Sequence, residues 1–557
     1  MGEVEYAVSF KEQLTLRGMV IGAVGSVILT MSSLYVALKL GALPWPIIFV
    51  ALASMFFLKF FKNSNINEIN VTHTAMSAGA MTAGGLAFTI PGIYMLDKSA
   101  RVNFLQLFFV VLGGVILGLI FTALIRKYFV VTKKLPYPMG QAAAETLMVG
   151  DEGGGKSKTL FSSLGIAGLF TFLRDGIPAV SGKTLIPATL MNQGMLGFGS
   201  LGGVWFSPML ISIGYIIGPV AIGVWFLGAL FGDFGILIGA VAGGLLSPER
   251  AGGIKSSLGI GLMVGTGLGI ILKGILPKAR EIFGPLFSRQ AISGGFIGLR
   301  WAPLVMALLA VLFTTICGMG VLPSVITILG VWLATAMSAQ VVGQSGINPM
   351  EVFGIIILLA VKAISTIGQT EAFFVAAVVA IACGLVGDVM NDFKSGYILN
   401  SDPKAQWIAE GIGGLIGAVV SVGSFYLIIA AYGPSAFGPG GLFVAPQAGA
   451  VAAMVGGIPH VPSFIAGLAA GCILYVVNFP VMTLGLGVYL PFYLSLTAFI
   501  GGGLRFILGK AFPAADKTGK GLIISSGLLG GEAVMGVIIA ICQAAAGLAG
   551  FGGLPQG

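Results

Sequence analysis

Apolar segments recur along almost the whole chain, from residue 14 to residue 550, and no polar stretch is long enough for a soluble domain. A helix needs about 20 apolar residues to cross the hydrocarbon of a membrane, and most of these segments reach that length. Strands of a membrane barrel would alternate apolar and polar positions over about ten residues, which this chain does not do. The pattern therefore predicts an all-α polytopic membrane protein with about 14 to 18 spans.

Prolines interrupt or bound several of these segments, among them Pro46, Pro136, Pro349 and Pro446. A helix break at membrane depth is tolerated only where protein or a cavity satisfies the freed backbone groups. In transporters such breaks commonly mark the path of the substrate. We therefore expect some helices to be broken or re-entrant.

Composition supports the same interpretation, since 57% of the residues are hydrophobic and only 9% are charged. The 88 glycines suit close packing of helices in lipid. The net charge of +9 is spread over short loops, which indicates membrane topology and argues against nucleic-acid binding. Lys and Arg in the first loops favour a cytoplasmic N-terminus. We expect an integral protein of the cell (inner) membrane.

A faint internal repeat divides the chain. Three pairs of segments resemble one another in the same order: 137–150 with 444–457, 207–218 with 490–501, and 255–267 with 524–536. The repeat predicts an N-terminal transmembrane half at 1–280, a basic cytoplasmic linker at 281–300 and a C-terminal transmembrane half at 301–557. The two halves are expected to share one orientation and to rock about a central site.

Ionisable residues at membrane depth are costly, so they are functional candidates by default. Glu145 and Glu351 each follow a proline break, where the N-terminus of a half-helix would attract an anionic group. Glu532 lies among small residues that leave room for a ligand. Each of these acids could instead pair with a basic group or lie at the end of a span. For Asp233 and Glu371 a position at the water interface is the favoured interpretation.

The most informative stretch is GDVMNDFKSGYILNSDPKAQ at 387–406. Asp388 and Asp392 are four residues apart and share one helical face, and Lys394 and Tyr397 follow. The stretch is either a cytoplasmic loop of capping charges or a substrate or gating element. His73 lies in a predicted span, where a packed neutral imidazole and a contact with a proton or chelate both remain open.

These motifs, taken together, resemble those of the oligopeptide transporter (OPT) family, which includes the yellow stripe-like metal-chelate carriers. The stretch at 387–406 resembles the family's GDxMQDxKxGYxxGxxPxxQ signature, and KLPYPMGQAAAE at 134–145 resembles its LPYPxGxAxAE segment. The remaining matches follow in the family's order: LTLRG at 14–18, SLYVALKLG at 33–41, GVYLPFYLSL at 487–496 and GGEAVMGV at 530–537. The compact form is similar to prokaryotic members.

The resemblance implies about sixteen spans in two related halves and a secondary, usually proton-coupled, importer. The motifs point to candidate residues for substrate binding or coupling: Tyr35, Lys39, Glu145, Asp388, Asp392, Lys394, Tyr397 and Glu532. Glu351 joins them from its own position after a proline break.

The sequence thus predicts a proton-coupled symporter that imports small oligopeptides, with peptide-like metal chelates as the alternative substrate and sodium as the alternative coupling ion. A channel would favour charged rings along one pore, and a membrane enzyme would need a nucleophile and a base close together. The sequence shows neither pattern, so we expect no enzyme activity. We also expect no cofactor, no resident metal and no nucleic-acid partner. Whether the protein forms a homo-oligomer in the bilayer stays open.

Overall fold

The structure is a computed structural model that describes residues 7–40, 47–151, 155–278, 301–346, 348–513 and 519–548. Helices make up nearly all of its regular structure. Within the described residues, the only sheet is an antiparallel pair formed by β1 (Thr189–Met191) and β2 (Gly203–Trp205). The prediction of an all-α polytopic membrane protein is confirmed. The predicted linker at 281–300 lies outside the described residues.

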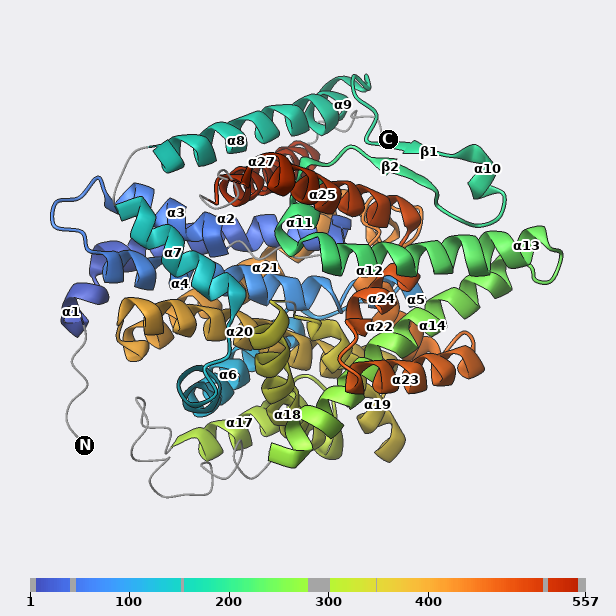
Figure 1. The fold of residues 1–557 in the computed structure, drawn as a ribbon. Coiled ribbons are helices and arrows are strands. Elements are labelled where there is room, and N and C mark those ends of the chain that lie inside the picture. Colours follow the sequence, from blue (N-terminus) through green and yellow to red (C-terminus); the bar gives the residue numbers. More distant parts are fainter. Residues whose placement is uncertain are drawn as a thin grey trace. The chain divides into compact units, whose positions relative to one another are not determined.

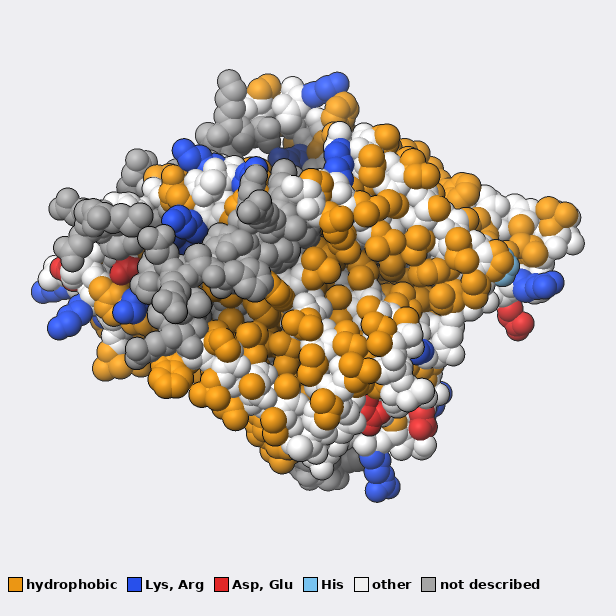
Figure 2. Space-filling model, turned by 90° about the horizontal axis from the view of Figure 1, so that it is seen from below, with side chains coloured by type: hydrophobic (Ala, Val, Ile, Leu, Met, Phe, Trp, Pro, Cys, Tyr) orange, Lys and Arg blue, Asp and Glu red, His pale blue; other side chains and the backbone are white. Residues whose placement is uncertain are grey.

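Nine helices in the described part of the chain are long and apolar enough to cross a membrane. A sharp break separates α22 (Pro446–Gly456) from α23 (Val461–Val476), and this pair gives a tenth, broken span if it is counted as one. Hydrophobic side chains cover much of the face seen in Figure 2, as expected for a surface in lipid. The total of about sixteen spans stays a prediction.

The chain folds into two compact units, and both combine early and late parts of the sequence. The first unit is built from Met1–Ser157 and Gly274–Val455, and the second from Lys158–Lys273 and Gly456–Gly557. Each half that the sequence predicts therefore contributes one segment to each unit. The division into two halves itself stays a prediction.

The first unit is helical throughout its described residues. Its elements are α1 (Phe10–Gln13), α2 (Leu16–Leu40), α3 (Ile47–Leu58), α4 (Ile66–Ala87), α5 (Gly92–Leu96), α6 (Phe104–Arg126), η1 (Lys127–Thr132), α7 (Pro138–Asp151), η5 (Leu276–Lys278), α17 (Ala302–Thr315), α18 (Val321–Ser345), α19 (Met350–Ile364), α20 (Gln369–Leu399), α21 (Pro403–Tyr432), η8 (Pro434–Ala436) and α22. Helices α4 and α20 lie against each other at its centre, although about 300 residues separate them in the sequence (Figure 1). Both are buried on all sides, which requires other helices to surround them.

Helices α4 and α20 run antiparallel. Gly85 of α4 lies against Ile381, and Ser77, two turns earlier in α4, bonds Asp392, three turns later in α20. The packing around the two helices also matches: α2, α3 and α21 pack on α4 as α18, α19 and α6 pack on α20. If α4 takes the place of α20, the helices that pack on α4 therefore correspond to the helices that pack on α20.

The starts of α7 and α22 follow the same exchange. Tyr137 and Ala445 each precede a proline, and both have left-handed backbone angles, with φ of 44° and 38°. The N–H of Tyr137 donates to the carbonyl of Gly343 in α18 at 2.9 Å, and the N–H of Ala445 donates to that of Leu38 in α2 at 2.9 Å. Because non-glycine residues rarely adopt this conformation, its recurrence indicates a shared construction.

This exchange corrects one expectation. The sequence predicts that the two halves share one orientation, whereas the helices that correspond in the first unit, α4 and α20, point in opposite directions. The corresponding helices are therefore inverted, as in many secondary transporters.

The second unit packs its helices closely through glycine. Gly261 of α14 leaves no room for a Cβ against the carbonyl of Phe464 in α23, and Gly487 of α24 leaves none against that of Trp225 in α12. Small residues at such crossings let backbones approach. The elements of this unit are α8 (Gly155–Thr171), η2 (Phe172–Gly176), α9 (Ile177–Ser181), β1, α10 (Gln193–Leu196), β2, α11 (Pro208–Ile217), α12 (Pro219–Ala229), η3 (Leu230–Gly239), α13 (Ala240–Ala242), α14 (Pro248–Gly269), η4 (Ile270–Ile275), α23, α24 (Val481–Tyr489), α25 (Phe492–Ala511) and α27 (Lys520–Leu548).

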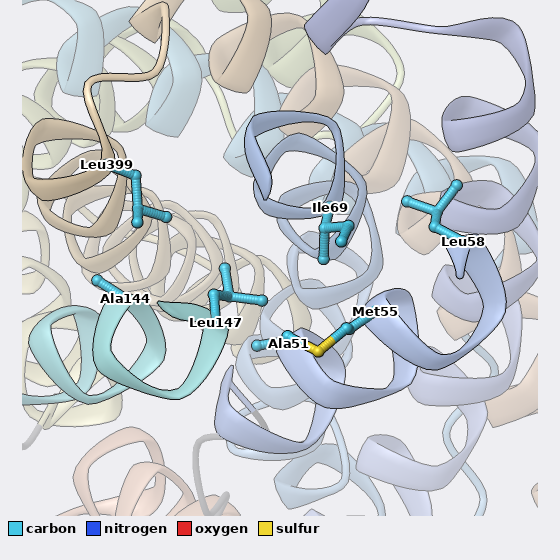
Figure 3. Close-up of a cluster of buried hydrophobic side chains, with 7 residues drawn as sticks. All are labelled: Ala51, Met55, Leu58, Ile69, Ala144, Leu147 and Leu399. Carbon is cyan, nitrogen blue, oxygen red and sulfur yellow. The ribbon is translucent and has the colours of Figure 1, made fainter. Parts of the chain in front are cut away.

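An apolar cluster fixes α7 beside α20 in the first unit. Figure 3 shows side chains from α3, α4, α7 and α20 that meet there: Ala51, Met55, Leu58, Ile69, Ala144, Leu147 and Leu399. All seven are buried. The cluster holds the half-helix that follows the proline break against the helix that carries the signature acids.

The crossing of α4 and α21 gives a direct test of this packing. A Cβ at Gly413 would overlap the carbonyl oxygen of Ala75, whereas a Cβ at Gly423 on the same helix meets nothing within 4 Å. Gly413→Ala is expected to lower the stability by about 1 to 3 kcal/mol, because overpacking forces the two backbones apart. Gly423→Ala, with the same change in helix propensity, should leave it unchanged or slightly raised. Thermal unfolding in detergent compares the two, and equal midpoints would contradict the crossing.

Candidate functional site

Two acids project from the middle of α20. Asp388 and Asp392 are both fully buried, as are nearly all residues of this helix from Ala372 to Gly396. Asp392 lies about 10 Å from the helix end at Leu399 and Asp388 about 16 Å, at a rise of about 1.5 Å per residue. Both acids therefore lie about two turns or more inside a helix that is long enough to cross a hydrocarbon layer of about 30 Å.

A third acid reaches the same place from α21. Carboxylate oxygens of Asp388, Asp392 and Glu410 all lie within 4.8 Å of one another, and the three residues are buried. We call these three residues the carboxylate cluster. Sequence reasoning did not select Glu410, although its position inside an apolar segment is the signal that selected the other buried acids.

His73 of α4 completes the surroundings of the carboxylate cluster. Its Nδ1 lies 3.8 Å from Oδ1 of Asp392, and its Nε2 lies 2.9 Å from Oδ1 of Asn70. Ser77, one turn further along α4, donates to Oδ2 of Asp392 at 3.2 Å. Of the two roles that the sequence left open for His73, the geometry favours contact with a titrating group.

The carboxylate cluster lacks a counter-charge. Within the described residues, both oxygens of Asp388, both of Glu410, Oδ1 of Asp392 and Nδ1 of His73 have no hydrogen-bond partner. Two negative charges 4.8 Å apart repel by about 3 kcal/mol at an effective dielectric constant of about 20. Three ionised acids would add three such terms and their desolvation, so the cluster must bind protons or a cation to stay buried.

Two sequence motifs meet beside the carboxylate cluster. The side chain of Asn391 in α20 accepts a hydrogen bond from the N–H of Gly140, in the first turn of α7, at 3.0 Å. A Cβ at Gly140 would overlap the carbonyl oxygen of Asn391, so only glycine fits there. The segment at 134–145 and the signature at 387–406 thus form one contact. Glu145 lies in α7, but its side chain is outside the described residues.

The other signature residues lie further along α20, away from the cluster. The ammonium group of Lys394 lies 5.9 Å from the ring of Tyr397, and Tyr397 is exposed. Gln406 of α21 donates to the backbone carbonyl of Asp392 at 2.6 Å and ties the two helices together. The signature therefore contains two acids of the carboxylate cluster and, in addition, residues that fix helix packing.

Tyr35 and Lys39 form a separate group at the far end of α2. The ammonium of Lys39 donates to the hydroxyl of Tyr35 at 3.1 Å, and Tyr35 packs edge-on against Phe443 with ring centroids 5.7 Å apart. Ser26 of α2 lies beside Gly79, close to the level of the cluster, and Lys39 follows about 20 Å further along that helix. The structure does not bring Lys39 to the acids.

Glu351 is buried in the first turn of α19, as expected for a residue at the start of a short helix. It too lies outside the carboxylate cluster. Lys362 at the other end of α19 donates to the carbonyls of Met454 and Val455, at 3.4 and 2.9 Å, and so caps the end of α22. Capping of a half-helix is a structural role for this exposed lysine.

Glu532 lies in the second unit, where all its hydrogen-bonding capacity is used. It accepts from Arg174 at 2.9 Å, from the hydroxyl of Ser207 at 3.0 and 3.1 Å, and from the N–H of Met209 at 2.9 Å. These bonds place its negative charge at the start of α11, where the helix dipole favours it. The geometry gives Glu532 a structural role beside the transport role that the sequence predicts.

The position of Asp233 differs from the one that the sequence favours. The sequence placed it at a water interface, but it is fully buried and pairs with Lys255 at 2.6 Å. Ser200 also donates to it at 2.6 Å. The correction arises because Lys255, 22 residues away in the sequence, supplies the counter-charge on a neighbouring helix.

Acids that have no counter-charge among the described residues, placed deep in a bundle of apolar and partly broken helices, are typical of a membrane transporter, in which such groups mark the path of an ion or solute. Comparison with known proteins agrees with this class. The chain belongs to the OPT oligopeptide transporter family, whose profile it matches over residues 13–275 and 288–543. A protein of Haemophilus influenzae (strain ATCC 51907 / DSM 11121 / KW20 / Rd), described as "Putative oligopeptide transporter", is 27% identical over 92% of this chain and 93% of its own length.

The buried pair of Arg174 and Glu532 generates a stability prediction. Arg174→Met leaves Glu532 buried without its cation and is expected to lower the stability by about 3 kcal/mol or more. The double variant with Glu532→Gln should lose much less than the two single variants together, because it removes both charges. Thermal unfolding midpoints of the three variants in detergent measure this coupling. Additive losses would contradict a structural pair.

Proposed function

We propose that this protein is a proton-coupled symporter that imports small oligopeptides, and that the carboxylate cluster is its coupling site. The observation that carries the proposal is the absence of a described counter-charge at Asp388, Asp392 and Glu410. Protons that bind there neutralise the acids and allow them to stay in the hydrocarbon region. Release of these protons on the other side of the membrane would then drive the return of the carrier.

The family description and the name of the relative support a peptide as substrate. A peptide carries an ammonium group and a carboxylate, so it needs an acidic and a basic partner. Lys39 beside Tyr35 can serve the second, whereas the carboxylate cluster binds the coupling protons and not the peptide. With this role the protein is a carrier and not an enzyme, and its N-terminus lies in the cytoplasm of the cell.

One observation favours the alternative substrate, a peptide-like metal chelate. Lys39 lies 5.3 Å from the ring centroid of Tyr35, which in turn packs against Phe443. A cation with aromatic neighbours suits a chelate, which presents carboxylates around its metal. Uptake of a labelled chelate and of a labelled tetrapeptide by the same vesicles decides between the two.

Peptide accumulation in proteoliposomes is expected to require an inward proton gradient. Glu410→Gln keeps the shape of the side chain but removes one acid, so it should lower gradient-driven accumulation by about tenfold or more, equivalent to about 1.4 kcal/mol. Exchange of labelled for unlabelled peptide needs no net proton movement and should persist. The thermal unfolding midpoint should stay the same or rise, because a repulsion is removed.

Glu249→Gln is the matched control, since Glu249 is an exposed acid at the start of α14. It should accumulate peptide as the unaltered protein does. Accumulation that ignores the proton gradient and follows a sodium gradient would reject protons as the coupling ion. A Glu410→Gln protein with full proton-driven accumulation would remove Glu410 from the coupling site.

A further inference from the structure

A line of polar side chains leads from the carboxylate cluster toward one end of the helix bundle. We call its members, Asn67, Asn70, His73, Ser395 and Ser401, the polar line. All five are buried, with at most 3% of their surface exposed. Polar groups this deep in a membrane protein are costly unless they are bonded to one another or serve the passage of a solute.

Hydrogen bonds connect the polar line without a break. Ser401 donates to Asn67 at 2.6 Å and accepts from the amide of Asn70 at 3.1 Å. The carbonyl oxygen of Asn70 accepts from Ser395 at 2.8 Å and faces Nε2 of His73 at 2.9 Å. The line starts at Asn67, one residue after α4 begins, and ends at His73, beside Asp392.

The bonds of Asn70 determine which nitrogen of His73 carries the proton. The side-chain oxygen of Asn70 can only accept, so Nε2 of the imidazole must be the donor in that bond. In the neutral ring Nδ1 then holds a lone pair, and this atom faces the carboxylate of Asp392 at 3.8 Å. Nδ1 has no other partner among the described residues, so it is free to take up a proton.

On the other side of the cluster, the described parts of α4 and α20 offer no such line. The stretch of α20 from Ala372 to Gly387 is apolar throughout and completely buried. In the corresponding part of α4, from Ala78 to Ala87, the only hydroxyl belongs to Thr82, and it donates to the carbonyl of Ala78 in its own helix. Along α4 and α20, the cluster thus has a polar connection toward one end only.

We propose that His73 is the residue through which the carboxylate cluster exchanges protons with the membrane face at which α2 and α4 begin, and that Asn70 positions its imidazole for this exchange. This inference rests on the proposed function. A protonated Asp392 transfers its proton to Nδ1 of His73, which leaves a carboxylate beside an imidazolium. The imidazolium then gives its Nε2 proton to a water molecule that enters the polar line from that face, which leaves the neutral ring protonated at Nδ1, and only O–H and N–H bonds change.

The charged groups around His73 are consistent with this path. On the cluster side it faces the three acids of α20 and α21. Toward the membrane face the next charges are Glu68 of α4 and Arg17 of α2, which pair at 2.7 Å, and the side chain of Arg17 is 30% exposed. From α6, Arg126 lies over the ring of Phe393 at 5.1 Å. Helix α3 carries no charged residue.

The test measures proton entry and peptide exchange separately. His73→Ala and Asn70→Leu proteins are reconstituted in vesicles that contain a pH-sensitive dye, and a labelled tetrapeptide is the substrate. Both variants are expected to exchange peptide within about twofold of the unaltered protein. Peptide-driven proton entry should fall by about tenfold or more, since a positioned proton-transferring group contributes about 100-fold in enzymes. Thr82→Val is the matched control on the same helix and should change neither rate.

Two results would overturn the inference. Equal losses of exchange and of proton entry in both variants would mean that the polar line only supports the fold. Proton entry at the unaltered rate in His73→Ala would exclude His73 from the path. If His73→Ala does not fold, His73→Gln keeps a polar side chain of similar size and is expected to show the same separation. Unaltered protein that accumulates peptide without any proton entry would instead reject the proposed function.

Discussion

A charge inside a hydrocarbon layer must be neutralised by something within its reach, and this constraint separates the buried residues of the protein into two groups. In the second unit Glu532 shares Arg174 with Asp175, and Asp233 pairs with Lys255, so each of these acids has a permanent cation beside it. In the first unit the carboxylate cluster has no described cation beside it. The acids with a permanent cation hold helices together, whereas the acids of the carboxylate cluster depend on protons or a cation that can bind and dissociate.

Much of this could be predicted from the sequence, because charges stand out in apolar segments. Asp388 and Asp392 were identified from their four-residue spacing and from the signature motif that contains them, and the structure places both in one buried cluster. The motif at 134–145 and the signature at 387–406 indicated the family, and the contact of Gly140 with Asn391 gives the two motifs a common structural role. The spacing and the motifs are local, so the sequence is sufficient to find them, whereas the contact joins residues 251 positions apart and needs the structure.

What the sequence could not provide depends on partners that are distant along the chain. Glu410 and His73 reach Asp392 from other helices, and neither carries a spacing signal toward it. For the same reason Glu532 looked like a ligand-binding acid, because Arg174 lies 358 residues away. The inverted relation of α4 and α20 was also missed, since the directions of these helices follow from packing between segments about 300 residues apart and not from the resemblance of short segments.

The matching starts of α7 and α22 have a consequence for how such a chain diverges in evolution. The left-handed residue before each proline is retained in both places, although Tyr137 and Ala445 share no side-chain chemistry. His73 and the acids, by contrast, occur in only one of the two corresponding settings. Descent from a common ancestor would preserve the joints of the framework in both copies while the proton chemistry differs between them, with His73 on α4 in one copy and the acids on α20 and α21 in the other. A search for self-similarity within the chain will therefore find turns and helix crossings, and it will overlook His73 and the acids.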